Sequence, residues 1–185
     1  MKRVIKWIGD FFVGKKEIIV DKEEIMTILF HRGRMLLLDK VIIMENKVVG
    51  EFLVTAEVCE GHEPIPGMPV MRGVEIPEMA FQLLGVLISK HPEMSPLLIN
   101  KAFAAREIAL VKFNGFIVPG DVLTLESGIE VEFDEVESAA RIESGKMIAK
   151  VNGKKKGIVS SVSLAVFDAL KMNPIPKKDS VPTTS

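Results

Sequence analysis

One histidine and one glutamate stand out as a candidate acid–base pair. His62 lies in a stretch rich in proline and glycine, residues 61–73, and Glu78 follows in the first turns of an apolar helix pattern. Proline fixes φ and glycine permits close backbone approach, so such a loop can hold a side chain in place. The free N–H groups at the start of a helix attract negative charge. The combination therefore suits a reaction that moves protons and stabilises a developing anion.

Plainer interpretations compete with this pair. A histidine in a loop is most often a polar surface residue. The polar stripe of the helix could be its solvent side, as in any amphipathic helix; it holds Glu75, Glu78, Gln82 and Ser89. No two of the three histidines, His31, His62 and His91, have the close spacing of a metal site. We therefore expect no metal and no organic cofactor.

The elements that must position these residues follow from hydrophobic spacing. Residues 76–89 carry apolar side chains at helical intervals, with Pro77 in the first turn, where its missing N–H removes no intrahelical bond. A shorter helix is expected over residues 22–30 and a loop over residues 60–72. Strands are predicted over residues 35–44, 48–58, 101–113, 122–133, 138–142, 146–151 and 157–167, with a tight turn at Asn152-Gly153. This order indicates an α+β domain in which the long helix covers a curved antiparallel sheet.

The two ends of the chain differ from this central domain, which we place at residues 20–168. Residues 1–19 form an amphipathic extension whose apolar side chains share one helical face: Val4, Trp7, Ile8, Phe11 and Phe12. We expect a short helix docked on the domain or on a second subunit, in preference to a helix on a membrane surface. The tail, residues 169–185, is rich in proline and small polar residues and is expected to be flexible.

Composition narrows the classes of function. The chain has 185 residues, with 24 Lys+Arg against 25 Asp+Glu and a net charge of -1. Nucleic acid is not expected as the main partner, because phosphate binding needs a basic surplus. No apolar run is long enough to span a bilayer and the N-terminus is a poor signal peptide, so we expect a cytoplasmic protein. The single cysteine, Cys59, is better explained as a small buried side chain than as a nucleophile.

The loop and the helix also match a known sequence pattern. Ile65-Pro66-Gly67-Met68-Pro69-Val70-Met71 is followed in register by Gly73-Val74, Glu78, Gln82 and Gly85. This stretch resembles the active-site motif of the 3-hydroxyacyl-[acyl-carrier-protein] dehydratases of the FabZ and FabA type. Other segments are similar to the same family in the same order: residues 25–41, 111–113, 118–121 and 151–154. The resemblance covers about residues 20–168.

The resemblance implies a hot-dog fold, in which a long central helix is wrapped by a curved antiparallel sheet. It implies a homodimer joined at sheet edges, with trimers of dimers as a further assembly. His62 of one chain would face Glu78 of the partner subunit. The implied reaction converts a (3R)-3-hydroxyacyl thioester on acyl carrier protein to a trans-2-enoyl thioester in fatty acid biosynthesis, with coenzyme A as the alternative carrier.

The resemblance also implies a role for each residue of the site. His62 is the base for the C2 proton, since an imidazole is largely neutral near pH 7. Glu78 gives a proton to the leaving hydroxyl, and Gln82 orients Glu78. Backbone N–H groups near Gly73 and Val74 hold the oxyanion of the thioester.

Binding of the acyl chain and of the carrier needs further residues. Candidates to line an apolar tunnel are Met68, Met71 and Phe81, for which core packing is the competing role. Basic side chains that could receive an acidic carrier protein are Arg34, Arg72, Lys101 and Arg106, each of which could equally be an ordinary solvated charge.

The chain departs from the family motif by extra residues between His62 and the Pro66-Gly67 step. These residues either displace His62 or bulge outward. Two alternatives to a dehydratase therefore stay open. The first is another hot-dog enzyme, an enoyl hydratase or an acyl thioesterase. The second is a non-catalytic protein that binds acyl thioesters.

Overall fold

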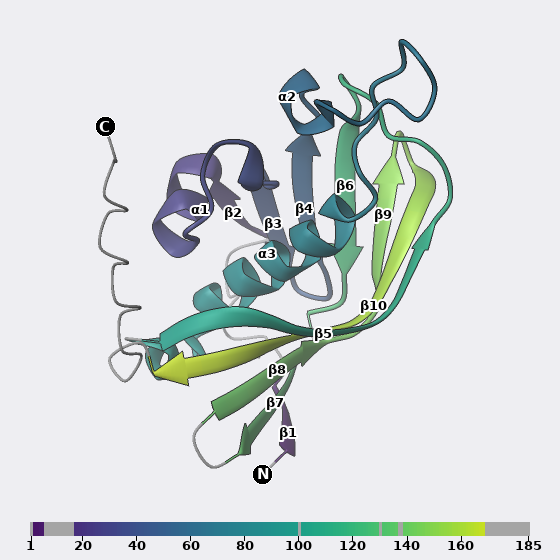
Figure 1. Cartoon of the computed structure of the whole chain (residues 1–185). Helices are drawn as coiled ribbons and strands as arrows, with labels where there is room; N and C mark the ends of the chain where they lie inside the picture. The colour runs from purple at the N-terminus through teal and green to yellow at the C-terminus, as the bar shows by residue number, and fades with distance from the viewer. Residues whose placement is uncertain (1, 6–16, 100, 130, 137–138, 169–185) are drawn as a thin grey trace, which may run out of the picture.

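A long helix lies against the inner face of a curved antiparallel sheet. The computed structural model describes residues 2–5, 17–99, 101–129, 131–136 and 139–168. The helix is α3 (Glu75–Lys90), and the sheet curls around it (Figure 1). This is the α+β architecture that the alternation of apolar and polar residues predicts.

The strands form one sheet in which every pairing is antiparallel. They are β1 (Lys2–Ile5), β2 (Glu17–Asp21), β3 (Lys40–Met44), β4 (Val48–Leu53), β5 (Lys101–Phe113), β6 (Val122–Ser127), β7 (Val131–Val136), β8 (Ala139–Ser144), β9 (Met147–Val151) and β10 (Lys154–Asp168). The order is β1-β7-β8-β10-β9-β6-β4-β3-β2, and β5 pairs with the other side of β10. The far side of β5 pairs with no strand of the described residues, so β5 is an open edge.

Short helices lie in the connections between strands. They are α1 (Lys22–Ile28), α2 (Ala56–Cys59) and the 3-10 helices η2 (Gly33–Met35) and η3 (Ser95–Leu98). Asp21 caps α1 by accepting a hydrogen bond from the Glu24 N–H at 2.9 Å, which satisfies an N–H that has no partner inside the helix. In the described part of the chain, no helix is both long and apolar enough to cross a bilayer.

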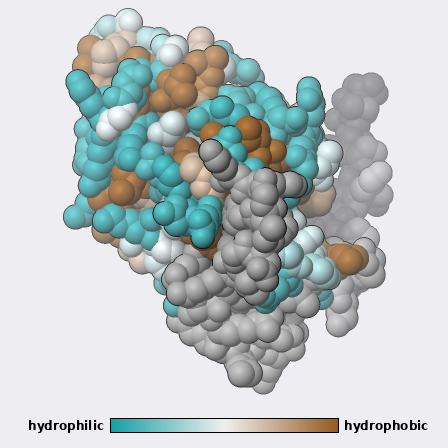
Figure 2. Space-filling view, turned by 180° about the vertical axis from the view of Figure 1, so that it is seen from behind, coloured by the Kyte–Doolittle hydropathy of each residue, from teal (hydrophilic) through white to brown (hydrophobic). Residues whose placement is uncertain are grey.

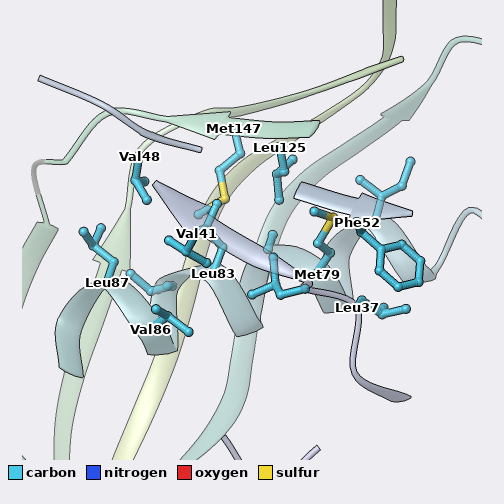
Figure 3. Packing of buried hydrophobic residues seen from close by; sticks show 14 of the residues in the cluster. Leu37, Val41, Val48, Phe52, Met79, Leu83, Val86, Leu87, Leu125 and Met147 are labelled. Atoms are coloured by element: carbon cyan, nitrogen blue, oxygen red, sulfur yellow. The ribbon is translucent and has the colours of Figure 1, made fainter. Parts of the chain in front are cut away.

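The core lies between α3 and the sheet. Leu83 and Leu87 of α3 point toward side chains from the strands, as Figure 3 shows for Val41, Val48, Leu125 and Met147. Burial of each such side chain contributes about 1.5–3 kcal/mol. Gly50 of β4 favours this close packing, because an added Cβ would lie 2.7 Å from the Leu38 side chain, which would have to move. Seen from behind, the described surface is largely hydrophilic, with small hydrophobic patches (Figure 2).

Several strand boundaries differ from the prediction. The predicted strand 35–44 holds η2 and an irregular stretch before β3, and the predicted strand 48–58 ends in α2. The predicted strand 122–133 is two strands, β6 and β7, with a bend at Ile129 after the end of β6. Apolar runs therefore predicted where the core lies better than where each strand begins and ends.

The N-terminal segment is a strand where the sequence predicts a helix. Lys2–Ile5 pairs with β7, placing Val4 opposite Glu132. The edge of β7 offers a row of unpaired N–H and C=O groups, and pairing with them outweighs helical spacing. The other apolar residues of the predicted helical face, Trp7, Ile8, Phe11 and Phe12, lie outside the described residues. The tail 169–185 also lies outside them. Strand β2 is also part of the sheet, and it begins at Glu17, before the expected domain start at residue 20.

Candidate active site

His62 is held at the base of a loop by backbone contacts on both sides. Its N–H donates to the Cys59 carbonyl at 3.2 Å, and the Val70 N–H donates to the His62 carbonyl at 3.0 Å. The ring Nδ1 lies 3.0 Å from the Val70 carbonyl oxygen. Gly61 turns the chain into this position with a φ of 73°, in the left-handed region that favours glycine.

The contact with Val70 sets the tautomer of the His62 ring. A carbonyl oxygen can only accept a hydrogen bond, so Nδ1 must carry the hydrogen. In the neutral ring, Nε2 then holds a free lone pair. His62 is therefore arranged to accept a proton at Nε2.

The extra residues of the loop bulge outward. Residues 63–67 are exposed, and a turn closes between Ile65 and Met68, whose N–H donates to the Ile65 carbonyl at 2.9 Å. His62 and Val70 pair at the base of this excursion, so the exposed residues 63–67 lie between the two paired residues.

His62 lines an apolar pocket of about 250 Å³ beside the start of α3. The other lining residues are Val70, Met71, Gly73, Ile76, Phe113, Gly115, Phe116 and Ile117. His62 is thus the one ionisable side chain in the lining. A ligand here would meet an apolar wall and a single proton acceptor, a typical arrangement for a small-molecule site.

Gly73 lets this pocket reach the backbone at the start of α3. An added Cβ would lie 3.0 Å from the Phe113 ring, tighter than nearly all real Cβ contacts. Among the hydrogen bonds of the described residues, none uses the N–H of Gly73 or Val74. Both N–H groups are therefore available to a negatively charged oxygen.

Glu78 lies in a separate hydrogen-bond network on α3. Its Oε1 accepts a hydrogen bond from Gln82 Nε2 at 3.0 Å and lies 3.0 Å from His31 Nε2. Gln82 also donates to the Met35 carbonyl at 2.7 Å, and its Oε1 accepts the Leu37 N–H at 2.9 Å. Gln82 thereby ties Glu78 to residues 35–37.

The polar stripe of α3 is not a solvent face. Gln82 is 1% exposed and Glu75 is 5% exposed, and Glu75 forms an ion pair with Arg72. Most buried polar groups in proteins are paired, as both of these side chains are. The interpretation of this stripe as the solvent side of an amphipathic helix is therefore wrong for these two residues.

The other predicted residues are distributed unevenly. Met71 lines the pocket, whereas Met68 lies in the outward loop and Phe81 packs against the core. Burial, and secondly the charge of Asp121, raise the pKa of the Cys59 thiol, which disfavours a thiolate nucleophile. The four basic candidates for carrier binding come from different elements: Arg34 from η2, Arg72 from the turn before α3, and Lys101 and Arg106 from β5.

Within one chain, His62 and Glu78 belong to different surroundings. His62 lines the pocket with Gly73 and Ile76, whereas Glu78 contacts His31 and Gln82. No hydrogen bond or ion pair between the described residues joins His62 to Glu78. Phe113, which lines the pocket, lies at the end of the open edge strand β5, so the pocket borders a free edge of the sheet (Figure 1).

His31 is a residue of the site that the sequence reasoning missed. It was considered only as a metal ligand, yet its ring reaches Glu78. The residues are far apart in sequence, so spacing could not reveal the contact. The available signal was the position of His31 in residues 25–41, which are similar to a segment of the same dehydratase family.

Comparison with known proteins gives consistent results. Residues 29–160 match the family model of the FabA-like domain. The 3-hydroxyacyl-[acyl-carrier-protein] dehydratase FabZ of Clostridium acetobutylicum is 39% identical over 140 residues, covering 72% of this chain and 89% of that protein. The protein of the same name from Enterococcus faecalis is 39% identical over 136 residues, covering 71% and 88%.

A solved structure supports the fold. The dehydratase heterocomplex ApeI:P from Xenorhabdus doucetiae superposes with a TM-score of 0.50 at 19% identity, covering 78% of this chain and 90% of that chain. With the curved sheet around α3, these findings confirm the expected hot-dog fold.

Proposed function

Because the chain belongs to the FabA-like family, we propose that it dehydrates 3-hydroxyacyl thioesters on acyl carrier protein to 2-enoyl thioesters, as a step of fatty acid biosynthesis. The curated relatives that cover most of its length bear the name of this reaction. The observation that carries the proposal for the site is the His62 ring, whose Nδ1–H is bound to Val70 and whose Nε2 is free beside an apolar pocket.

The first part of the reaction is removal of a proton from C2. His62 Nε2 accepts this proton, and the C–H electrons move toward the thioester. Charge then develops on the thioester oxygen, where the unused N–H groups of Gly73 and Val74 can stabilise it. Each contribution of this kind is worth about 10² to 10³ in rate.

The second part is loss of the C3 hydroxyl. Glu78 gives a proton to this oxygen, the C3–O bond breaks, the C2=C3 bond forms and water leaves. His62 now holds one proton more and Glu78 one fewer, and transfer through water restores both. A carboxylic acid and an imidazole thus suffice without a metal or an organic cofactor.

We place the site between two subunits. His62 and Glu78 have different surroundings within one chain, so a second chain must bring them together across one substrate. The open strand β5 suits this role because its side chains Leu110 and Phe113 are apolar and exposed, and because Phe113 and the nearby Phe116 line the pocket. A long apolar edge strand promotes pairing with another chain. The proposed unit is a homodimer joined at β5, which could assemble further into a trimer of dimers.

The acyl chain would enter the apolar pocket, where Met71 and Ile117 form part of the wall. Arg34 and Arg106 are exposed and suit an acidic carrier protein, whereas Arg72 is paired with Glu75. With a single cysteine the chain suits a reducing cytoplasm, where this reaction would take place.

Turnover assays test the activity and the pair together. The purified protein is incubated with a short 3-hydroxyacyl thioester on acyl carrier protein, and separately on coenzyme A, and the enoyl product is followed by mass spectrometry. His62→Ala and Glu78→Gln are assayed in parallel, with Ser89→Ala as the control on the same helix. We expect both site variants to lose at least about 10² in kcat. Free acid instead of enoyl product would indicate a thioesterase, and binding without turnover would contradict the proposal.

A further inference from the structure

We propose that His31 is a positioning residue that, together with Gln82, holds Oε1 of Glu78, so that Oε2 is the oxygen that exchanges the proton with substrate. This inference rests on the proposed role of Glu78 as the acid of the dehydration. It adds to the site a residue whose contribution is made through Glu78 and not by contact with substrate.

The first support is the asymmetry of the Glu78 carboxyl group. Oε1 lies 3.0 Å from both His31 Nε2 and Gln82 Nε2. Among the described residues, Oε2 has no hydrogen-bond partner. Two partners on one oxygen fix the rotation of the carboxyl group, which leaves the other oxygen free toward solvent or substrate.

The second support is the tautomer that the His31 ring must adopt. Its Nδ1 is buried and has no hydrogen-bond partner in the described residues. A hydrogen on Nδ1 would be a buried donor without an acceptor, which is costly. The arrangement that avoids this cost has the hydrogen on Nε2, which then donates to Glu78 Oε1.

The third support is the rigidity of the segment that carries His31. Arg32 donates to three carbonyl oxygens: Met26 at 2.7 Å, Leu29 at 2.7 Å and His31 at 2.6 Å. These contacts cap the C-terminal end of α1 and hold the His31 backbone. Gln82 holds the following residues through Met35 and Leu37. His31 therefore approaches Glu78 from a segment fixed on both sides.

The chemical consequence concerns both states of the acid. In the protonated state, Oε1 accepts from His31 and Gln82, and the hydrogen sits on Oε2. After this proton has moved to the C3 oxygen, the two donors on Oε1 stabilise the carboxylate that remains. Loss of the His31 donor should slow the chemical step and leave substrate binding nearly unchanged.

Two variants of His31 separate its hydrogen bond from its shape. His31→Phe keeps a flat ring and removes the donor, whereas His31→Gln loses the ring and keeps an N–H donor at a similar reach. We expect kcat to fall about ten- to a hundredfold in His31→Phe, as for loss of a hydrogen bond to a charged group. KM should change little, and His31→Gln should recover most of kcat. The neighbouring control Phe30→Ala, whose side chain is 87% exposed, should behave as wild type.

A second measurement tests the contact without turnover. In protein labelled with ¹⁵N-histidine, the His31 ring should show its hydrogen on Nε2, and Glu78→Ala should shift the His31 signals but not those of His91. An unchanged His31 spectrum in Glu78→Ala would overturn the inference, as would equal kcat in the Phe and Gln variants. An inactive wild type with the expected His31 spectrum would instead overturn the proposed function and leave the contact itself established.

Discussion

Gln82 provides the most quantitative test of how α3 holds the site. It is 1% exposed and makes three hydrogen bonds, to the Met35 carbonyl, the Leu37 N–H and Glu78 Oε1. Gln82→Met keeps the length of the side chain and removes every polar atom. The Leu37 N–H then becomes a buried donor without a partner, which costs about 1–3 kcal/mol. The Met35 carbonyl belongs to an exposed residue and can reach water, so its lost bond adds only about 1 kcal/mol.

We therefore expect Gln82→Met to lower the free energy of unfolding by about 2–4 kcal/mol. For a chain of this size that corresponds to a fall in Tm of roughly 4–16 °C. Urea titrations followed by circular dichroism measure the difference, at one protein concentration because the proposed dimer makes stability depend on it. Ser89→Ala, about two turns further along α3, is the matched control. A loss below about 0.5 kcal/mol, the range of ordinary surface substitutions, would refute the reasoning.

Three other predictions follow from the pocket, the sheet edge and the cysteine. Gly73→Ala puts a methyl group 3.0 Å from the Phe113 ring, so KM for the acyl substrate should rise about tenfold; an unchanged KM would argue against the pocket as the acyl site. Leu110→Lys adds a charge to an exposed position of β5, and sedimentation should show a monomer without activity, whereas an intact dimer would exclude β5 as the interface. Burial, and secondly Asp121, raise the pKa of the Cys59 thiol, so the folded chain keeps this proton to a higher pH than the unfolded chain. The stabilisation that comes from the protonated thiol is complete below the pKa of Cys59 in the unfolded chain. It is lost as pH rises through the pKa of Cys59 in the folded chain. Between about pH 8 and pH 10 the wild type should therefore lose more stability in denaturant titrations than Cys59→Ala, and equal losses would contradict the shift.

The elements of the core were predictable because their patterns are local. Helix α3, predicted over residues 76–89, extends over Glu75–Lys90, since its apolar stripe recurs at every turn. The turn at Asn152-Gly153 is confirmed by positive φ at both residues. The N-terminal strand was not predictable, because its partner β7 lies far away in the sequence and helical spacing is the only local signal.

The site was predictable only in part. The residue types of His62 and Glu78 suggested acid–base chemistry, but the hydrogen bond from His62 to Val70 depends on how the loop closes. The contact of His31 with Glu78 joins α3 to the segment between α1 and η2, and residue spacing in the sequence cannot reveal such a contact. Likewise, the burial of Gln82 comes from residues 35–37, which fold over the helix. Contacts between distant segments were therefore the information that the sequence pattern lacked.

The central claim is that each dehydratase site combines His62 of one subunit with Glu78 of the partner subunit. His62→Ala and Glu78→Gln, each inactive alone, are co-expressed with different tags and the mixed dimers are assayed for enoyl product. In a mixed dimer one site has lost both residues and the other keeps both. Random pairing should therefore restore about a quarter of wild-type activity, and purified mixed dimers about half, by the symmetry of a two-fold dimer. Activity no greater than that of the separate variants, in dimers shown to be mixed, would contradict the shared site.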